Sequence, residues 1–248
     1  MKRGIVITVL AVLAFAVIII ARMPASWVIP SPPAGIACTG TDGTLWSGAC
    51  TGLVVEGQPV GDVTWSVHPA KLLRAKLAAH VVLARTSRAG RSDAQADLEW
   101  GLGGRVTARN VKADFPLDPS LAPQLHLTWQ GNIHTDLALV RVNGKALEEL
   151  QGLIEAHDLR ELGSQGADFG SYSLQFPGGA GAQTGRLHDL GGPLSVEGTV
   201  RLTNEPGIVV EGLVAARPTA PQDLQTQLRM LGSPDAQGRR PFSLSEAF

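Results

Sequence analysis

This sequence predicts an antiparallel β-sheet domain that follows one membrane-spanning helix, and three observations lead to this fold class. Residues 4–21 form an apolar run without a charge. Beyond residue 36, short segments of alternating apolar and polar residues recur between glycine-rich turns. Strands spaced roughly 8–12 residues apart are typical of all-β architectures. The irregular spacing leaves open whether the sheet is open and curled or closed and barrel-like.

The apolar run at residues 4–21 is long enough to cross a bilayer. At ~1.5 Å per residue it makes a helix of roughly 27 Å. A cleaved signal peptide is the alternative, but its apolar region usually has only about 7–15 residues, and no clear small-x-small site follows Arg22. Lys2 and Arg3 precede the run, so the positive-inside rule predicts a cytoplasmic N-terminus. We therefore expect a cytoplasmic tip and transmembrane anchor at residues 1–22, with the rest in the periplasm.

A proline-rich stretch and a pair of cysteines follow the anchor. Residues 23–36 include the run Pro30-Ser31-Pro32-Pro33, which predicts an extended linker before a β-rich domain at residues 37–248. Cys38 and Cys50 are the two cysteines of the chain. In an oxidising compartment such a pair predicts a disulfide. Two free thiols or half of a metal site are the alternatives, although the spacing does not match a zinc-binding pair.

Alternation of apolar and polar residues predicts the strands in order. In residues 61–67, Val63, Trp65 and Val67 lie on one face, and the helical turn expected at residues 70–74 follows. Asn143-Gly144 and residues 204–207 are turn signals. The strands are expected at residues 52–57, 61–67, 80–84, 94–99, 105–114, 124–129, 136–142, 172–176, 194–202 and 208–216.

One segment has a helical pattern instead. Over residues 145–155, Leu147, Leu150 and Ile154 share one face at a period of 3.6 residues. Lys145 and Glu149 are spaced as an i,i+4 ion pair. We expect a short helix here that covers an edge of the sheet or an end of the barrel.

No recognisable constellation for catalysis, a cofactor or a metal is present in the sequence. The histidines are scattered, and the nearest two, His126 and His134, do not have the spacing of a metalloprotease helix. The glycine-rich residues 178–181 lack the strand and helix that flank a dinucleotide-binding loop. A net charge of −1 gives no broad attraction to nucleic acid or anionic lipid. We expect a protein that is not an enzyme and has no cofactor, metal or nucleic-acid partner.

Three segments in the same order resemble the type II secretion system protein N family. The first, residues 43–48, matches G-T-[VL]-W-x-G, and the second, residues 65–73, matches W-x-[LV]-x-P-x-x-L-L. The third, residues 228–239, matches the closing pattern L-x-x-L-G-x-x-D-x-x-G-R. The resemblance extends from the anchor to Arg240 and is diffuse between residues 83 and 192. The residues that carry the first two segments are Gly43, Thr44, Leu45, Trp46, Gly48, Trp65, Pro69, Leu72 and Leu73.

This resemblance implies a single-pass inner-membrane, non-enzymatic accessory subunit of the type II secretion apparatus, which exports folded proteins across the outer membrane. The implied partners are the inner membrane, the inner-membrane platform and the outer-membrane channel subunit. We expect contact with the protein partners through exposed strand edges, with the hairpin at residues 194–216 as the edge. Trp46 and Trp65 are expected to be buried against each other and to specify the fold rather than bind a partner.

A lipid-handling protein with a β-groove, tethered to the inner membrane, is the alternative function. Its support is an analogy of fold, which does not establish function. An unfilled apolar groove would favour it, whereas a closed apolar face would favour a scaffold. The residues expected to line that inner face are Val63, Trp65, Val67, Leu125, Leu127 and Trp129.

Overall fold

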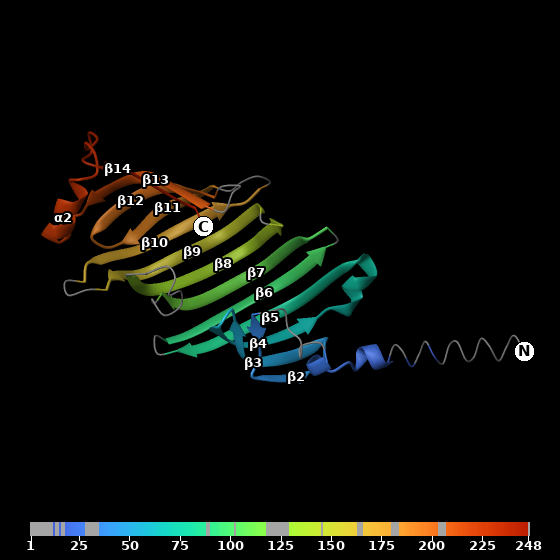
Figure 1. The fold of residues 1–248 in the computed structure, drawn as a ribbon. Coiled ribbons are helices and arrows are strands. Elements are labelled where there is room, and N and C mark those ends of the chain that lie inside the picture. Colours follow the sequence, from blue (N-terminus) through green and yellow to red (C-terminus); the bar gives the residue numbers. More distant parts are fainter. Residues whose placement is uncertain are drawn as a thin grey trace, which may run out of the picture. The chain divides into compact units, whose positions relative to one another are not determined.

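The structure is a computed structural model in which antiparallel strands predominate (Figure 1). It describes residues 12, 15, 18–27, 35–87, 90–101, 103–117, 129–144, 146–162, 166–179, 184–202 and 207–247. The chain divides into two compact units, Met1–Arg85 and Thr86–Phe248. The predicted mainly-β class is confirmed.

The first unit is built around one central strand. β3 (Ser47–Val55) pairs with β1 (Ile36–Ala37) and β2 (Gly40–Gly43) along one side and with β4 (Gln58–Val67) along the other. β4 pairs in turn with β5 (Lys76–Ser87). Two 3-10 turns complete the unit: η1 (Ala25–Trp27) and η2 (Pro69–Arg74). The turn predicted at residues 70–74 is η2, and Val63, Trp65 and Val67 alternate with exposed neighbours as predicted.

In the second unit, each strand pairs with the next one along the chain, so the spatial order is the sequence order. Within the described residues no pairing returns from β14 to β6, and the sheet of this unit is therefore open. Its elements are β6 (Gly90–Gly101), β7 (Arg105–Leu117), β8 (Trp129–Asn143), β9 (Ala146–Glu161), β10 (Asp168–Pro177), β11 (Thr184–Gly191), β12 (Leu194–Leu202), β13 (Gly207–Ala216), α2 (Gln222–Leu228) and β14 (Arg240–Ala247).

The register gives the sheet of the second unit an apolar and a polar face, because directly paired residues point to the same side. On the polar face of β7 and β8, the carboxylate of Asp136 lies 3.3 Å from the Lys112 ammonium. On the apolar face, Leu137, Leu150 and Phe176 form one buried cluster. A second cluster, Leu194, Val196 and Val214, is covered by Leu224 and Leu228 of α2.

The helix predicted at residues 145–155 is wrong, because most of this segment belongs to strand β9. Leu150 and Ile154 are four residues apart, a spacing that places two side chains on one face of a helix and also of a strand. Leu147 reaches the same apolar cluster because the register between β8 and β9 shifts beside Arg141 and Val142. The covering helix of the second unit is α2 instead.

The predicted anchor lies mostly outside the described residues. Residues 18–21 are helical, and in the part of the chain that the structure describes no helix is long and apolar enough to cross a membrane. Leu125 and Leu127, two residues of the expected inner face, also lie outside the described residues, and so does most of the predicted strand at 124–129.

Candidate functional site: the tryptophan hairpin and its disulfide

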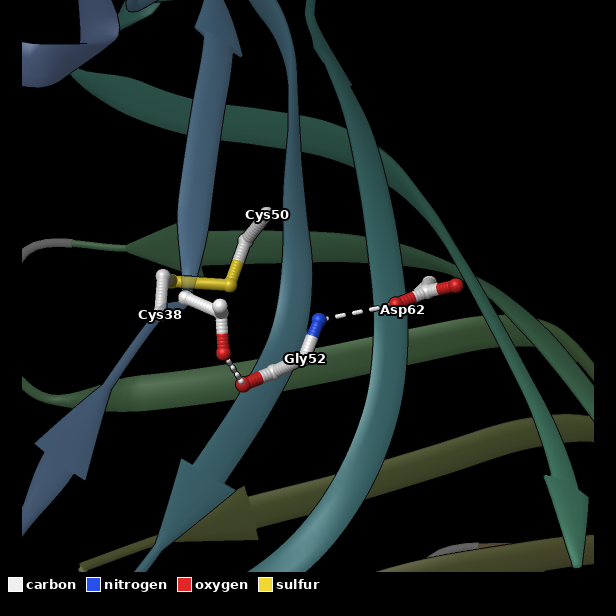
Figure 2. The surroundings of a disulfide bond; sticks show 5 residues. Cys38, Cys50, Gly52 and Asp62 are labelled. Carbon is white, nitrogen blue, oxygen red and sulfur yellow. Dashed lines mark hydrogen bonds between the residues drawn. A yellow bond between two sulfur atoms is a disulfide. The ribbon is translucent and has the colours of Figure 1, made fainter.

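Cys38 and Cys50 form a disulfide, as predicted, with their Cα atoms 5.6 Å apart. Cys38 follows β1, and Cys50 lies buried in β3 (Figure 2). Just beyond the bridge the register of β3 shifts, and Gly52 adopts a φ of 61°. Such a bulge leaves a backbone N–H without its ladder partner. The Asp62 carboxylate accepts the hydrogen bond of the Gly52 N–H at 2.8 Å. The bridge and this bond fix the bulge from two sides.

The first family-like segment is the tight hairpin between β2 and β3. The N–H of Thr44 donates to the Ser47 carbonyl at 2.8 Å, and the N–H of Ser47 donates to the Thr44 hydroxyl at 3.2 Å. Gly43 has a φ of 84°, and a Cβ atom there would stand 2.5 Å from the Ser47 carbonyl oxygen. Glycine is therefore required at the entry to the turn. We call residues 43–48 the tryptophan hairpin.

Trp65 of β4 packs on this hairpin. It lies directly opposite Gly48 in the register, and a Cβ at Gly48 would meet Trp65 Cζ2 at 2.6 Å. The indole N–H of Trp65 donates to the Leu45 carbonyl at 3.1 Å. Because Gly48 has no side chain, the Trp65 ring can occupy the space beside it.

Trp46 holds the segment that precedes the sheet. Its indole N–H donates to the Ile20 carbonyl at 2.8 Å, at the end of the helical residues 18–21. The N–H of Leu45 donates to the Met23 carbonyl at 3.0 Å, and Pro24 forms a β-bridge with Thr44. We call these three contacts the clamp.

The expected burial of Trp46 and Trp65 against each other is wrong. Within the described residues the aromatic ring pair is Trp129 with Phe169, at 4.5 Å between ring centroids. Both motif tryptophans are half-buried, and each directs its N–H to a different carbonyl. The Trp46 indole bonds to the segment that precedes the sheet and the Trp65 indole bonds to the hairpin, so the two rings serve different contacts.

The second family-like segment continues from Trp65 into η2. The carbonyl of Trp46 accepts the N–H of Val67 at 2.6 Å. Pro69 begins η2, where its missing N–H costs nothing. Leu72 is 42% exposed, and the side chain of Leu73 lies outside the described part. The structure therefore brings Gly43, Thr44, Leu45, Trp46, Gly48 and Trp65 together, while Pro69 and Leu72 lie in the adjoining turn.

The third family-like segment is a loop closed by Asp235. One carboxylate oxygen accepts the N–H groups of Gln237 and Arg239, and the other accepts Nε of Arg239 at 2.9 Å. Desolvation opposes ionisation of Asp235, but the hydrogen bonds from Arg239 and Gln237 outweigh it and hold the pKa of Asp235 below its usual value. Gly238, with a φ of 78°, completes the turn. The D-x-x-G-R pattern is thus explained as a self-contained loop.

A polar junction that the sequence analysis missed lies at the ends of β11 and β13. Arg217 donates to the Asp189 carboxylate at 2.5 Å and to the carbonyls of Gly192 and Leu194. Burial opposes ionisation of Asp189, but hydrogen bonds from Arg217 and from the Val196 and Gly191 N–H groups lower its pKa. Asp189 and Arg217 are separated by 28 residues, so only the strand register could have paired them.

None of these groups forms a recognisable reaction centre. The Thr44 hydroxyl and the Trp46 indole of the tryptophan hairpin, and the Trp65 indole that packs on it, are engaged with backbone groups. Among the described residues, no group of three His, Cys, Asp or Glu side chains could hold a metal ion. The arrangement is suited to fixing geometry and presenting edges.

Comparison with known proteins gives the same family for nearly all of the sheet. Residues 34–243 match the family model of type II secretion system (T2SS), protein N. The type II secretion system protein N of Vibrio cholerae serotype O1 is 26% identical over 246 residues, covering 91% of each chain. That of Aeromonas hydrophila is 25% identical over 258 residues, covering 98% of each. No solved structure matches.

Proposed function

Because the chain belongs to the type II secretion system protein N family, we propose that it is a non-enzymatic accessory subunit that supports the export of folded proteins across the outer membrane. The family match over residues 34–243 carries this proposal, since it includes the tryptophan hairpin, η2 and the Asp235 loop. In the tryptophan hairpin and the Asp235 loop, the polar groups of Thr44, Trp65 and Asp235 take part in packing and backbone hydrogen bonding. That distribution supports a structural role.

We further propose the placement of the parts. Residues 1–22 anchor the protein in the inner membrane with the N-terminus in the cytoplasm, residues 23–36 link the anchor to the sheet, and residues 37–248 form the periplasmic domain. The apolar run supports the anchor. The disulfide supports an oxidising compartment for the domain. The clamp would then hold the sheet close to the membrane surface.

The surface for other secretion components is an edge of the second unit. The hairpin at residues 194–216 was expected to be that edge, but this is wrong, because β14 pairs with β13 along its whole length. β14 is the terminal strand of the order. Its row of backbone groups is suited to pairing with an extended strand of the inner-membrane platform or the outer-membrane channel subunit.

Pro241 indicates which β14 groups face outward. Proline occurs in edge strands where its missing N–H would point away from the sheet. Because alternate residues share a direction, Ser243 and Ser245 then offer their N–H and C=O groups to a partner. Leu244, 55% exposed, adds an apolar contact beside them.

The experiment combines deletion with crosslinking in cells that assemble the apparatus. Deletion should lower the export of folded proteins. A photo-crosslinking residue at Ser243 or Ser245 should give adducts with secretion components. The matched control is Thr199, which is also exposed but lies on the interior strand β12. Unchanged export together with no adducts would reject the proposal, and copurified phospholipid in that case would favour the lipid-handling alternative.

A further inference from the structure

We propose that Trp27 is an interfacial anchor, which lies among the headgroups of the bilayer and holds an edge of the first unit at the membrane surface. Trp27 is 68% exposed, whereas Trp100 and Trp129 are 54% and 36% exposed and the two motif tryptophans are half-buried. An indole ring normally contributes its large apolar surface to a core or an interface. The exposure of Trp27 therefore indicates a contact outside the chain. The inference rests on the inner-membrane placement proposed above.

The helical residues that precede Trp27 are apolar and exposed on several sides. Ile18, Ile19 and Ile20 are 59%, 45% and 53% exposed. Successive residues of a helix point about 100° apart, so these three side chains together face more than half of the helix circumference. A helix that is apolar all round requires an apolar environment. The acyl chains of a bilayer would cover all three isoleucines at once.

Trp27 follows the end of this helix through compact turns. The N–H of Arg22 donates to the Ile18 carbonyl at 3.0 Å, which is the last helical bond. The N–H of Trp27 donates to the Pro24 carbonyl at 3.1 Å, which forms η1. These turns keep the ring closer to the end of the apolar run than an extended linker would. Where the apolar run leaves the hydrocarbon core, the headgroup layer begins, so the ring lies at the depth where tryptophan is enriched.

The clamp fixes the position of Trp27 relative to the sheet. η1 lies in contact with β2, and its first residue, Ala25, is only 1% exposed. In Figure 1 the N-terminal helical residues lead directly to the short blue turn beside β2. The clamp ties Ile20, Met23 and Pro24 to the tryptophan hairpin. Insertion of the Trp27 ring among the headgroups therefore also sets the distance between the first unit and the membrane.

A bilayer interface fits the chemistry of this region better than a charged partner. Residues 18–27 and β2 together contain one basic and one acidic residue, Arg22 and Asp42, so no excess of charge attracts a partner here. An indole ring combines an apolar body with an N–H group at its edge. The boundary between acyl chains and headgroups offers both an apolar environment and hydrogen-bond acceptors, which accounts for the enrichment of tryptophan there.

The test is fluorine NMR of the full chain, labelled with 5-fluorotryptophan, in nanodiscs of phosphatidylcholine and phosphatidylglycerol. The variants Trp27→Phe and Trp100→Phe assign the two resonances by their loss. A spin label on the lipid headgroups should broaden the Trp27 resonance several-fold more than a water-soluble gadolinium chelate does. Trp100 is the matched control for a ring in water, since it is 54% exposed and lies in the second unit, and its resonance should respond more strongly to the chelate.

The proposal would be overturned if the chelate broadened the Trp27 resonance as strongly as that of Trp100. Protection of Trp27 from the chelate that appears only after other secretion components are added would also overturn it, because the ring would then contact a protein. Failure of the chain to enter the discs would reject the anchor and this inference with it. Thiol titration shows that the disulfide, and hence the first unit, is intact in each variant. Export is measured separately, so normal export in a Trp27→Ser variant that has lost the lipid contact leaves the proposed function intact.

Discussion

In the first unit, the buried apolar residues among those described are the small ones Ala25, Cys50 and Ala78. The second unit buries leucine, valine and phenylalanine side chains in two clusters. Covalent and backbone constraints fix the first unit: the disulfide, the bulge held by Asp62 and the tryptophan hairpin. A small core benefits from such constraints. These constraints depend on precise local geometry, and such geometry requires particular residues. This explains why two of the family-like segments lie in the first unit.

The largest effect is expected from the second unit's core. Phe176→Ala removes a side chain that is only 3% exposed and packs with Leu137 and Leu150. We expect a loss of about 3–5 kcal/mol in the free energy of unfolding of this unit. Urea unfolding should show an earlier transition, while thiol titration finds the disulfide of the first unit intact. A loss below about 1 kcal/mol would mean that apolar clusters do not stabilise this unit.

Removal of the disulfide tests the first unit in the same way. Cys38→Ser/Cys50→Ser should lower its free energy of unfolding by about 2–4 kcal/mol, since the short loop is no longer closed in the unfolded chain. The second unit should melt as before. The control is the unreduced wild type, whose unfolded form should contain no titratable thiol. Similar losses in both units would contradict the contrast between them.

Gly48→Ala tests how closely the tryptophan hairpin is packed. The added Cβ would stand 2.6 Å from the Trp65 ring and 2.7 Å from the Asp42 carbonyl oxygen. Overpacking of this kind costs about 1–3 kcal/mol. In a double-mutant cycle, Trp65→Ala should relieve part of the cost, because one of the two clashes disappears. Additive effects of the two substitutions would show that the ring and Gly48 are not coupled.

Trp46→Phe tests the clamp by removing a single hydrogen bond. The loss of the bond to the Ile20 carbonyl should cost about 0.5–1.5 kcal/mol. Hydrogen exchange of the Leu45 N–H, which bonds to Met23, should accelerate. Trp65→Phe is the comparison variant, since it removes the indole bond to the Leu45 carbonyl but leaves the contacts of the clamp to Ile20, Met23 and Pro24 in place. Faster exchange at Leu45 in that variant alone would contradict the assigned clamp.

The smallest effect at neutral pH is expected from titration of Asp189. Its pKa is lowered in the folded state, so its contribution is complete above the usual range of an aspartate and is lost as pH falls through the folded pKa. Acid should therefore lower the free energy of unfolding of the second unit, because protonation of Asp189 weakens its bonds to Arg217. Asp189→Asn should flatten that part of the pH profile in melting experiments. A steeper acid limb in the variant would contradict the assignment.

The elements that the sequence predicts are those with a clear alternation of apolar side chains. β4 and β12 alternate cleanly and have half-buried or buried apolar residues at every second position. β2, with the sequence GTDG, has no apolar side chain to signal a strand. β9 was assigned to a helix because its leucine and isoleucine spacing fits both periods. Pairing with β8 and β10, which only the register supplies, decides between them.

The candidate site was predictable as a motif but not as a set of contacts. The spacing and context of the two cysteines predicted the disulfide, and the resemblance to the family singled out Gly43 and Gly48 without their geometric reason. The partner of the Trp46 indole, the Ile20 carbonyl, lies 26 residues away and carries no side-chain signal. The same holds for β14: its position outside β13 follows from pairing, not from composition.

The agreement of spatial and sequence order in the second unit has a consequence for how the chain acquires its structure. Each strand can add to the strand made just before it, so the sheet can assemble in the direction of synthesis. Contacts between sequence neighbours favour rapid folding. Until β14 emerges, β13 carries the unpaired edge. The unpaired edge thus moves from strand to strand along the growing chain until β14 pairs with β13, and at each stage this edge is the place where mispairing is most favoured.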